Sequence, residues 1–261
     1  MIRRWLYIEE RMSRLATWSL RVAVFALPVS ALALGLFWAE VLDFNAALRT
    51  LIAGIALAGL ALLLAIAAFV VIWNEGLRGL GRVVGAAFLA SLLLLPGAAV
   101  LALGTLVPAI HDVTTDSEEP LLFETLGYAR SRAANALDPP DAAVAQAQST
   151  AWPDVKPLEF DASPDEIYNS LLALVARYRW RVIDATPPRG GLRDGRIEAT
   201  TRSLPFGLRA DIALRVRQTA SGVRVDMRSV SREGERDYGM NANRITTLMA
   251  DLSEARGRRA R

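Results

Sequence analysis

Three long apolar runs in the first 110 residues constrain the fold of this chain more than any other feature of its sequence. Residues 22–39, 51–73 and 83–110 form runs of 18, 23 and 28 residues without a charge. An α-helix rises about 1.5 Å per residue, so helices of this length can cross a hydrocarbon core of about 30 Å. Only helices and closed barrels satisfy their backbone polar groups in lipid, and the runs lack the alternation of barrel strands. We therefore predict three transmembrane helices.

The charged residues divide the chain into two parts of different character. Residues 1–110 hold 8 basic and 5 acidic residues, whereas residues 111–261 hold 22 of each. We expect a membrane anchor followed by a water-facing domain, because the second part is too charged to lie in lipid. The chain has no Cys and one His, His111. This excludes disulfides, thiolate catalysis and any site that needs two imidazoles.

The basic residues near the apolar runs predict the orientation of the anchor. Five arginines precede the first run and two separate the second from the third, whereas five acidic residues follow the third run before the next basic residue. The positive-inside rule then places the N-terminus in the cytoplasm. In a bacterium the C-terminal domain would lie in the periplasm, behind a multi-pass anchor in the inner membrane.

This organisation predicts four segments. Residues 1–21 form a cytoplasmic amphipathic segment, in which Trp5, Ile8, Met12 and Leu15 share one side. It is either a helix in the membrane interface or an ordinary start to the first span. Residues 22–110 are the three-span anchor, and residues 111–156 are an acidic juxtamembrane segment and Pro-rich linker. Within it, residues 133–153 are expected to lack regular structure, because their prolines remove backbone donors. Residues 157–261 are the periplasmic domain.

The composition of the spans favours an anchor over a transporter. Transport pathways usually contain ionisable residues at mid-membrane depth, and the three runs contain none. Small residues four apart, as in Gly54 with Ala58, Ala86 with Ala90, and Ala98 with Ala102, suit close helix packing.

The periodicity after residue 157 predicts an α+β fold. A short strand at 158–160 precedes a helix that begins at Ser163 and Pro164 and runs to about Tyr178. Four strands follow at about 180–185, 196–202, 208–218 and 223–231, with apolar and polar residues alternating along the last two. A helix at about 241–256 ends the pattern. The order β-α-β-β-β-β-α predicts two helices packed on one face of an antiparallel sheet, a two-layer sandwich.

The other face of this sheet carries many charges of both signs. Residues 162–261 have 19 basic and 12 acidic residues, whereas residues 111–161 have 3 and 10. One interpretation is a solvated face with cross-strand ion pairs. The other is a surface that binds anionic lipid headgroups or envelope polymers through arginine forks. The residues concerned are Arg196, Glu198, Arg202, Arg209, Asp211, Arg215, Arg217, Arg224, Asp226 and Arg228.

Two motifs indicate a family. Residues 111–116 (HDVTTD), with Pro120 and Phe123, resemble the first motif of a bacterial family known as domain of unknown function number 1499. Its closing motif resembles residues 225–232 (VDMRSVSR) and 237–245 (DYGMNANRI), and residues 152–157 (WPDVKP) also fit. The resemblance covers about residues 111–255. It implies a location in the cell envelope and implies no activity.

The closing motif and nearby strand positions supply the candidate ligand-binding residues. One interpretation is a hydrogen-bonded corner between sheet and helix, in which Asp237 or Asn241 caps the helix and Asp226 or Asp211 pairs with Arg228 or Arg244. The other is a pocket for an anionic or hydroxylated ligand. The residues are Asp211, Asp226, Arg228, Ser229, Ser231, Arg232, Asp237, Asn241 and Arg244.

No catalytic motif, metal site or cofactor site follows from the sequence. His111 adjoins a predicted span, and the acidic set Asp112, Asp116, Glu118 and Glu119 lacks the spacing of a calcium loop. We therefore predict a non-enzymatic envelope protein whose partners are the lipid bilayer and either a partner protein or an anionic envelope component. Nucleic acid is not an expected partner. The alternatives are a periplasmic hydrolase or transferase with an unrecognised carboxylate site, and an accessory subunit of a membrane transport assembly.

Overall fold

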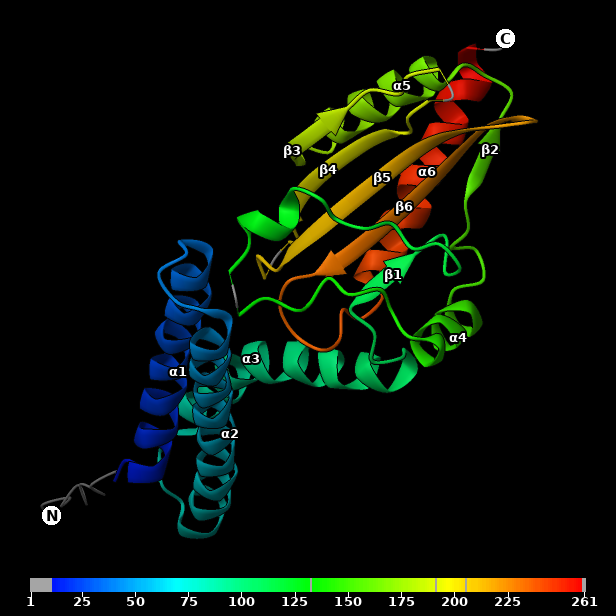
Figure 1. The fold of residues 1–261 in the computed structure, drawn as a ribbon. Coiled ribbons are helices and arrows are strands. Elements are labelled where there is room, and N and C mark those ends of the chain that lie inside the picture. The colour runs from blue at the N-terminus through cyan, green and yellow to red at the C-terminus, as the bar shows by residue number, and fades with distance from the viewer. Residues whose placement is uncertain (1–10, 132, 191, 205, 260–261) are drawn as a thin grey trace, which may run out of the picture. The chain divides into compact units, whose positions relative to one another are not determined.

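The computed structural model describes residues 11–131, 133–190, 192–204 and 206–259. The chain divides into two compact units between Ala102 and Leu103. The first holds the apolar helices and the second holds the sheet with its helices (Figure 1).

The three predicted helices are present. They are α1 (Arg14–Trp38), α2 (Phe44–Glu75) and α3 (Leu80–Leu106), and each is long and apolar enough to cross a membrane. Two N-terminal caps are visible, because the side chains of Ser13 and Asp43 accept hydrogen bonds from Ala16 N and Ala46 N. Gly76 ends α2 in the left-handed region, at φ 68°, where glycine has no steric penalty.

Small residues mediate the packing of the apolar helices. Ala16, Ala23, Ala58 and Ala61 are at most 1% exposed. A Cβ added to Gly54 would lie 2.2 Å from Ser30 Oγ, so only glycine fits where α2 meets α1. Of the predicted small pairs, Gly54 with Ala58 and Ala86 with Ala90 are buried, whereas Ala98 and Ala102 are exposed.

The start of α1 lies beside the turn between α2 and α3. The backbone N–H of Ser13 donates to Arg78 O, and the N–H of Arg78 donates to Arg11 O. Both segments are therefore at one end of the helical unit. Of the predicted amphipathic segment, Trp5 and Ile8 lie outside the described residues, while Leu15 belongs to α1.

The second unit is built on one antiparallel sheet of six strands. Strand order is β1-β6-β5-β4-β3, and β2 pairs with the free part of β6 beyond β1. The α+β class with an open sheet is confirmed, and the four predicted long strands are correct to within one residue at each end. The strands are β1 (Asp112–Thr114), β2 (Leu158–Phe160), β3 (Arg181–Thr186), β4 (Gly195–Arg202), β5 (Arg209–Thr219) and β6 (Gly222–Ser231).

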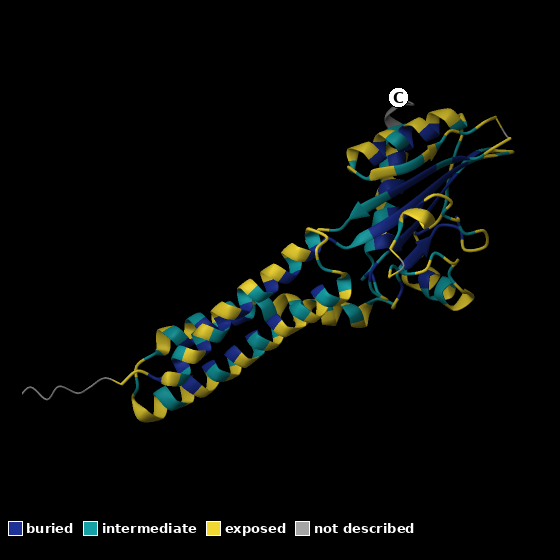
Figure 2. Cartoon of the chain, turned by 60° about the vertical axis from the view of Figure 1, so that its left-hand side comes forward, coloured by how far each residue is buried: buried dark blue, intermediate teal, exposed yellow. Residues whose placement is uncertain are grey.

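Helices α5 (Pro164–Arg177) and α6 (Met240–Arg259) cover one face of this sheet. We call it the helix face. The predicted apolar stripes are confirmed, because each residue that forms them is at most 5% exposed and belongs to one core cluster. They are Ile167, Leu171, Leu174 and Val175 on α5, and Ile245, Leu248, Met249 and Leu252 on α6. Alternate residues of β5 and β6 complete the core, which Figure 2 shows as buried.

The predicted lack of regular structure at residues 133–153 is wrong for part of that range. Helix α4 (Ala142–Ala151) begins directly after Asp141, whose side chain accepts a hydrogen bond from Val144 N. Pro139 and Pro140 precede this helix instead of interrupting it, and the Ala and Gln residues that follow favour helix. The side-chain amide of Gln148 donates to Thr114 O and accepts from Thr114 N, so α4 closes the edge of β1.

The segment before α4 also belongs to the folded domain. Strand β1 joins the sheet, and a 3-10 helix, η1 (Leu126–Ala129), follows it. Leu121 and Leu126 of this segment are buried, whereas Leu122 and Tyr128 are exposed. Residues 112–130, which we call the covering segment, begin with β1 at the edge of the sheet and then lie across the face opposite the helices, where they contact Arg228, Arg215 and Glu198.

Candidate functional site

Of the ten charged residues predicted on this face, five are buried and five are partly exposed, so the interpretation of a solvated face is wrong for its centre. The side chains of Asp211, Asp226 and Arg228 are fully buried, and Arg215 is 5% exposed. The covering segment contacts this face from β6 to β4, and it brings the acidic residues that precede the domain against the basic residues of the strands. Opposite charges therefore meet between segments about 100 residues apart.

Four of these residues form a closed ring of ion pairs. Arg215 contacts Asp226 at 3.0 Å and Asp116 at 3.2 Å. Arg224 contacts the same two carboxylates, at 3.0 Å and 2.8 Å. Because Asp116 comes from the covering segment and the other three from β5 and β6, the ring attaches this segment to the sheet. Each buried charge in it has an opposite partner, as low-dielectric surroundings require.

Arg228 uses its whole guanidinium within the chain. Nε and Nη2 donate to the two carboxylate oxygens of Asp112, at 3.0 and 2.6 Å. Its other acceptors are the carbonyl oxygens of Leu121, Leu137 and Asp138, at 2.6–3.0 Å. This bidentate, fully satisfied arrangement joins three segments of chain at one buried point. Arg228 is therefore a structural centre of this face.

The aspartates pair with other arginines than the sequence suggested. The prediction that Asp226 or Asp211 pairs with Arg228 or Arg244 is wrong. Asp226 belongs to the ring, and Asp211 contacts Arg232 at 2.7 Å and Arg130 at 2.9 Å.

Glu198 on β4 is held by the backbone of the covering segment. Its carboxylate accepts hydrogen bonds from the N–H groups of Glu124, Thr125 and Leu126, at 2.5, 3.0 and 2.7 Å. These N–H groups belong to the start of η1 and have no carbonyl partner within that short helix. A carboxylate of the sheet thus serves as the N-terminal cap of η1.

The remaining candidate residues lie on the helix face. Asn241 of α6 accepts from Ser229 Oγ at 2.8 Å and donates to Ser231 Oγ and His111 O, both at 2.9 Å. Arg244 donates to Ser229 Oγ and to Asn241 Oδ1. Burial lowers the pKa of Arg244 to about 10, despite the attraction of the nearby Asp237 carboxylate.

Asp237 caps α6, as one of the sequence alternatives proposed. Its carboxylate accepts from Gly239 N at 2.9 Å and from Asn241 N at 2.7 Å. Burial raises the pKa of Asp237, and these two hydrogen bonds act in the opposite direction.

The nine candidate ligand-binding residues therefore do not meet at one place. Side chains alternate between the two faces along β6, so Asp226, Arg228 and Arg232 lie on the covered face while Ser229 and Ser231 lie on the helix face. Asp211 joins the first set, and Asp237, Asn241 and Arg244 join the second. The polar groups of both sets bond mainly to other parts of this chain.

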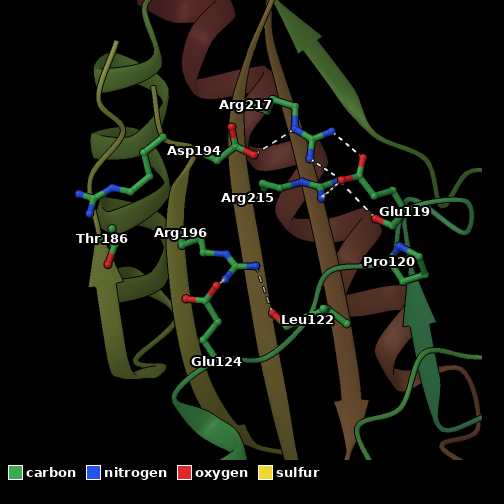
Figure 3. A pocket seen from close by; sticks show the side chains of 10 residues that line it. Glu119, Pro120, Leu122, Glu124, Thr186, Asp194, Arg196, Arg215 and Arg217 are labelled. Atoms are coloured by element: carbon green, nitrogen blue, oxygen red, sulfur yellow. Dashed lines mark hydrogen bonds and ion pairs between the residues drawn. The ribbon is translucent and has the colours of Figure 1, made fainter. Parts of the chain in front are cut away.

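A hollow on the covered face is the site that the sequence prediction missed. It has a volume of about 450 Å³ and lies over β4 and β5, between the β3–β4 turn and the covering segment (Figure 3). Four arginines and three acidic residues line it, together with Pro120, Leu122 and Thr186. The charged residues are Arg193, Arg196, Arg215, Arg217, Glu119, Glu124 and Asp194. Outward-facing arginines at alternate positions were visible in the sequence, but the acidic residues opposite them were not.

Arg217 and Glu119 form the most regular contact in the hollow. Nη1 and Nη2 of Arg217 donate to the two oxygens of Glu119, at 2.7 and 2.9 Å, while Nε donates to Asp194 at 3.0 Å. The hydrogen bonds and the positive charge of Arg217 lower the pKa of Glu119 to about 2. Glu119 is therefore a carboxylate, not an acid, near neutral pH.

The described residues hold no group of three or more His, Asp or Glu side chains arranged for a metal ion. The acidic set considered for calcium is dispersed, since Asp112 binds Arg228 and Asp116 binds Arg215 and Arg224. Oxygen ligands that are already paired with arginine are poor ligands for a cation.

Comparison with known proteins gives one match. Residues 132–252 match the family described as Protein of unknown function (DUF1499), inside the range that the motifs predicted. Neither the curated proteins nor the solved structures contain a match to the chain. The matched range begins after the covering segment and includes β2–β6, α4, α5 and most of α6. The C-terminal domain of this chain is therefore similar to the DUF1499 family over most of its length.

Proposed function

We propose that the chain is a multi-pass protein of a bacterial inner membrane whose periplasmic domain binds an anionic envelope component without catalysing a reaction. The observation that carries this proposal is the arginine-lined hollow on the covered face.

The arrangement of basic residues supports the topology. The backbone pairing of residues 11–13 with Arg78 puts the start of α1 and the α2–α3 turn at the same end of the helical unit. Arg14, Arg78 and Arg82 belong to these segments, and Arg82 donates to Thr17 Oγ1 at 2.6 Å. A basic end of this kind favours the cytoplasmic side. After three spans the C-terminal domain would then lie on the opposite side.

Fusions test this topology. Alkaline phosphatase placed after Arg261 should be active, because it requires the periplasm to form its disulfides. The same fusion after Gly76 should be inactive, since that turn would face the cytoplasm. The reverse pattern of activities would contradict the proposed orientation.

The charge of the hollow supports anion binding. Arg215 and Arg217 come from β5 and Arg196 from β4, so strands paired along their whole length position these guanidinium groups. Arginine presents a planar fork of N–H donors that matches carboxylate and phosphate groups. Arg193, at the β3–β4 turn, is exposed and donates to Pro187 O at 3.3 Å, which leaves much of its fork toward solvent.

The state of the carboxylates argues against hydrolysis or group transfer in this hollow. A general acid needs a raised carboxyl pKa, whereas the pKa of Glu119 is lowered by Arg217. Glu124 pairs with Arg196, and Asp194 pairs with Arg217. These three carboxylates therefore neutralise the positive charges of neighbouring arginines.

Binding measurements on the full chain in a neutral detergent test the role of the hollow. Polyglutamate should bind and polylysine should not, and binding should weaken as salt screens the arginines. Arg196→Ala should lower the affinity for polyglutamate about tenfold, because charged hydrogen bonds contribute about 1.5 kcal/mol or more. Arg181→Ala, an exposed arginine of β3 that does not line the hollow, is the matched control. Equal losses in the two variants would show that the hollow is not the binding site.

A role as subunit of a membrane assembly is the second candidate, favoured by α3. Its residues Leu95, Ala98 and Leu101 are exposed, and it has fewer buried residues than α1 or α2. A stoichiometric membrane partner that is lost on Ala98→Trp would favour this candidate.

A further inference from the structure

The covering segment holds the backbone of Glu119 in a fixed position. The carboxylate of Asp116 accepts hydrogen bonds from the N–H groups of Glu118 and Glu119, at 3.2 and 2.9 Å. Asp116 is itself attached to the sheet through Arg215 and Arg224. The turn that carries Glu119 is therefore attached to the ion-pair ring through Asp116. The side chain of Glu119, in contrast, is 63% exposed.

The partner of Glu119 is positioned independently of it. Asp194 holds Nε of Arg217, and the two Nη groups face the hollow, where they meet both oxygens of Glu119 (Figure 3). This end-on, two-bond contact is the one by which arginine recognises the carboxylate of a separate molecule.

A second contact in the hollow repeats this arrangement. Glu124, also from the covering segment and 67% exposed, pairs with Arg196 of β4. Two exposed carboxylates of one loop thus occupy two arginines of the sheet in the same hollow. Exposed ion pairs contribute little to stability, because both partners are well solvated when apart.

We infer that Glu119 and Glu124 stand in for ligand carboxylates, and that the hollow takes an acidic, peptide-like ligand that displaces Glu119 from Arg217. This inference rests on the proposed function and specifies the chemical class of its ligand. Displacement breaks two exposed hydrogen bonds and forms two equivalent ones, so its cost is small. Like the covering segment, such a ligand carries more than one carboxylate along one chain.

The test measures the affinity of the full chain, in neutral detergent, for N-acetylated triglutamate, with triglutamine as the uncharged control peptide. Glu119→Gln should bind triglutamate about two- to fivefold more tightly than the wild type, since the internal competitor is weakened. Glu118→Gln removes the same charge from the neighbouring residue, whose side chain does not line the hollow, and should change the affinity less than twofold. Arg217→Lys keeps the positive charge but lacks the fork, and should bind about tenfold more weakly.

The other possible results contradict different parts of the inference. If the wild type binds triglutamate but Glu119→Gln binds no more tightly than Glu118→Gln, displacement is wrong while the proposed function stands. If inorganic pyrophosphate binds more tightly than triglutamate, the assignment of a carboxylate ligand is wrong. If no form of the chain binds triglutamate or polyglutamate, the inference and the proposed function both fail. Thermal unfolding of each variant shows whether a loss of affinity reflects a loss of fold.

Discussion

The two faces of the sheet are both covered, but by different means and to different extents. On the helix face, α5 and α6 pack apolar side chains against alternate residues of β5 and β6. On the covered face, the other alternate residues of β5 and β6 are mainly Arg and Asp, and the covering segment supplies several of their partners. A charged strand face therefore does not imply a solvated one when the same chain carries a segment of opposite charge.

The two faces should differ in how well they tolerate single substitutions. Apolar contacts are non-directional and add up over area, so one side chain carries only its share. An ion pair in the interior is stable only while both partners are present, because a single buried charge has lost its water without compensation. We expect single substitutions on the two faces to differ in magnitude and in how they are rescued.

The largest effect is expected from Arg228→Met. The change leaves the carboxylate of Asp112 and three carbonyl oxygens without their donor, and we expect unfolding to become about 3–5 kcal/mol easier. Urea unfolding of the full chain in detergent, followed by tryptophan fluorescence, measures this loss. Adding Asp112→Asn should restore part of it, because the double variant has no buried unpaired charge. A loss below about 1 kcal/mol would show that this face is not held by its charges.

On the helix face, Leu248→Ala should cost about 3 kcal/mol. Leu248 is fully buried in the core cluster, and its loss leaves a cavity that the packing cannot fill. The same unfolding experiment at low and high salt sharpens the comparison. The effect of Leu248→Ala should not depend on salt, because no charge is involved. A strong salt dependence would mean that the two faces are coupled.

Glu198→Gln should have a smaller effect, about 2 kcal/mol. The carboxylate accepts three backbone hydrogen bonds from the covering segment, and the amide keeps only one acceptor oxygen. Hydrogen exchange at residues 124–126 should become faster in the variant, since these N–H groups lose their partner. Glu159→Gln, on an exposed position of β2, is the control and should leave stability and exchange unchanged.

The smallest effect is expected from Glu119→Gln, and it depends on pH. Arg217 lowers the pKa of Glu119 from 4.5 to about 2, so the folded state prefers the carboxylate more than the unfolded state does. This contribution is present above pH 4.5 and is lost as the pH falls towards 2. The melting temperature of Glu119→Gln should therefore lie slightly below that of the wild type at pH 7 and approach it at pH 3. A gap that widens on acidification would contradict the assigned pairing.

Local patterns in the sequence predicted most of the elements. Ser163 and Pro164 begin α5 as expected, and Ser163 accepts a hydrogen bond from Glu166 N. The alternation along β5 and β6 predicted which residues share a face. Helix α4 and strand β1 were missed, because α4 comes just after Pro139, Pro140 and Asp141, and β1 is a short strand in a segment interpreted as a juxtamembrane linker. Neither presents a periodic pattern long enough to recognise.

The candidate site was predicted less well than the elements. Arg196, Arg215 and Arg217 were recognised as outward-facing arginines, but their partners Glu119, Glu124 and Asp116 were assigned to a juxtamembrane segment. Arg215, Arg217 and Arg224 contact carboxylates of the covering segment that are 98–108 positions away in the sequence. Nothing in the local sequence around a charged residue specifies which distant charge it meets.

The sequence by itself determined that this chain has three apolar helices and an antiparallel sheet with one apolar face, because helix and strand periodicities are properties of neighbouring residues. Only the tertiary structure decided that the covering segment crosses the other face, and that the predicted polar corner is divided between the two sides of β6. The physical reason is that charges attract over distance without regard to chain order. The topology of the sheet therefore selects which pairs are formed.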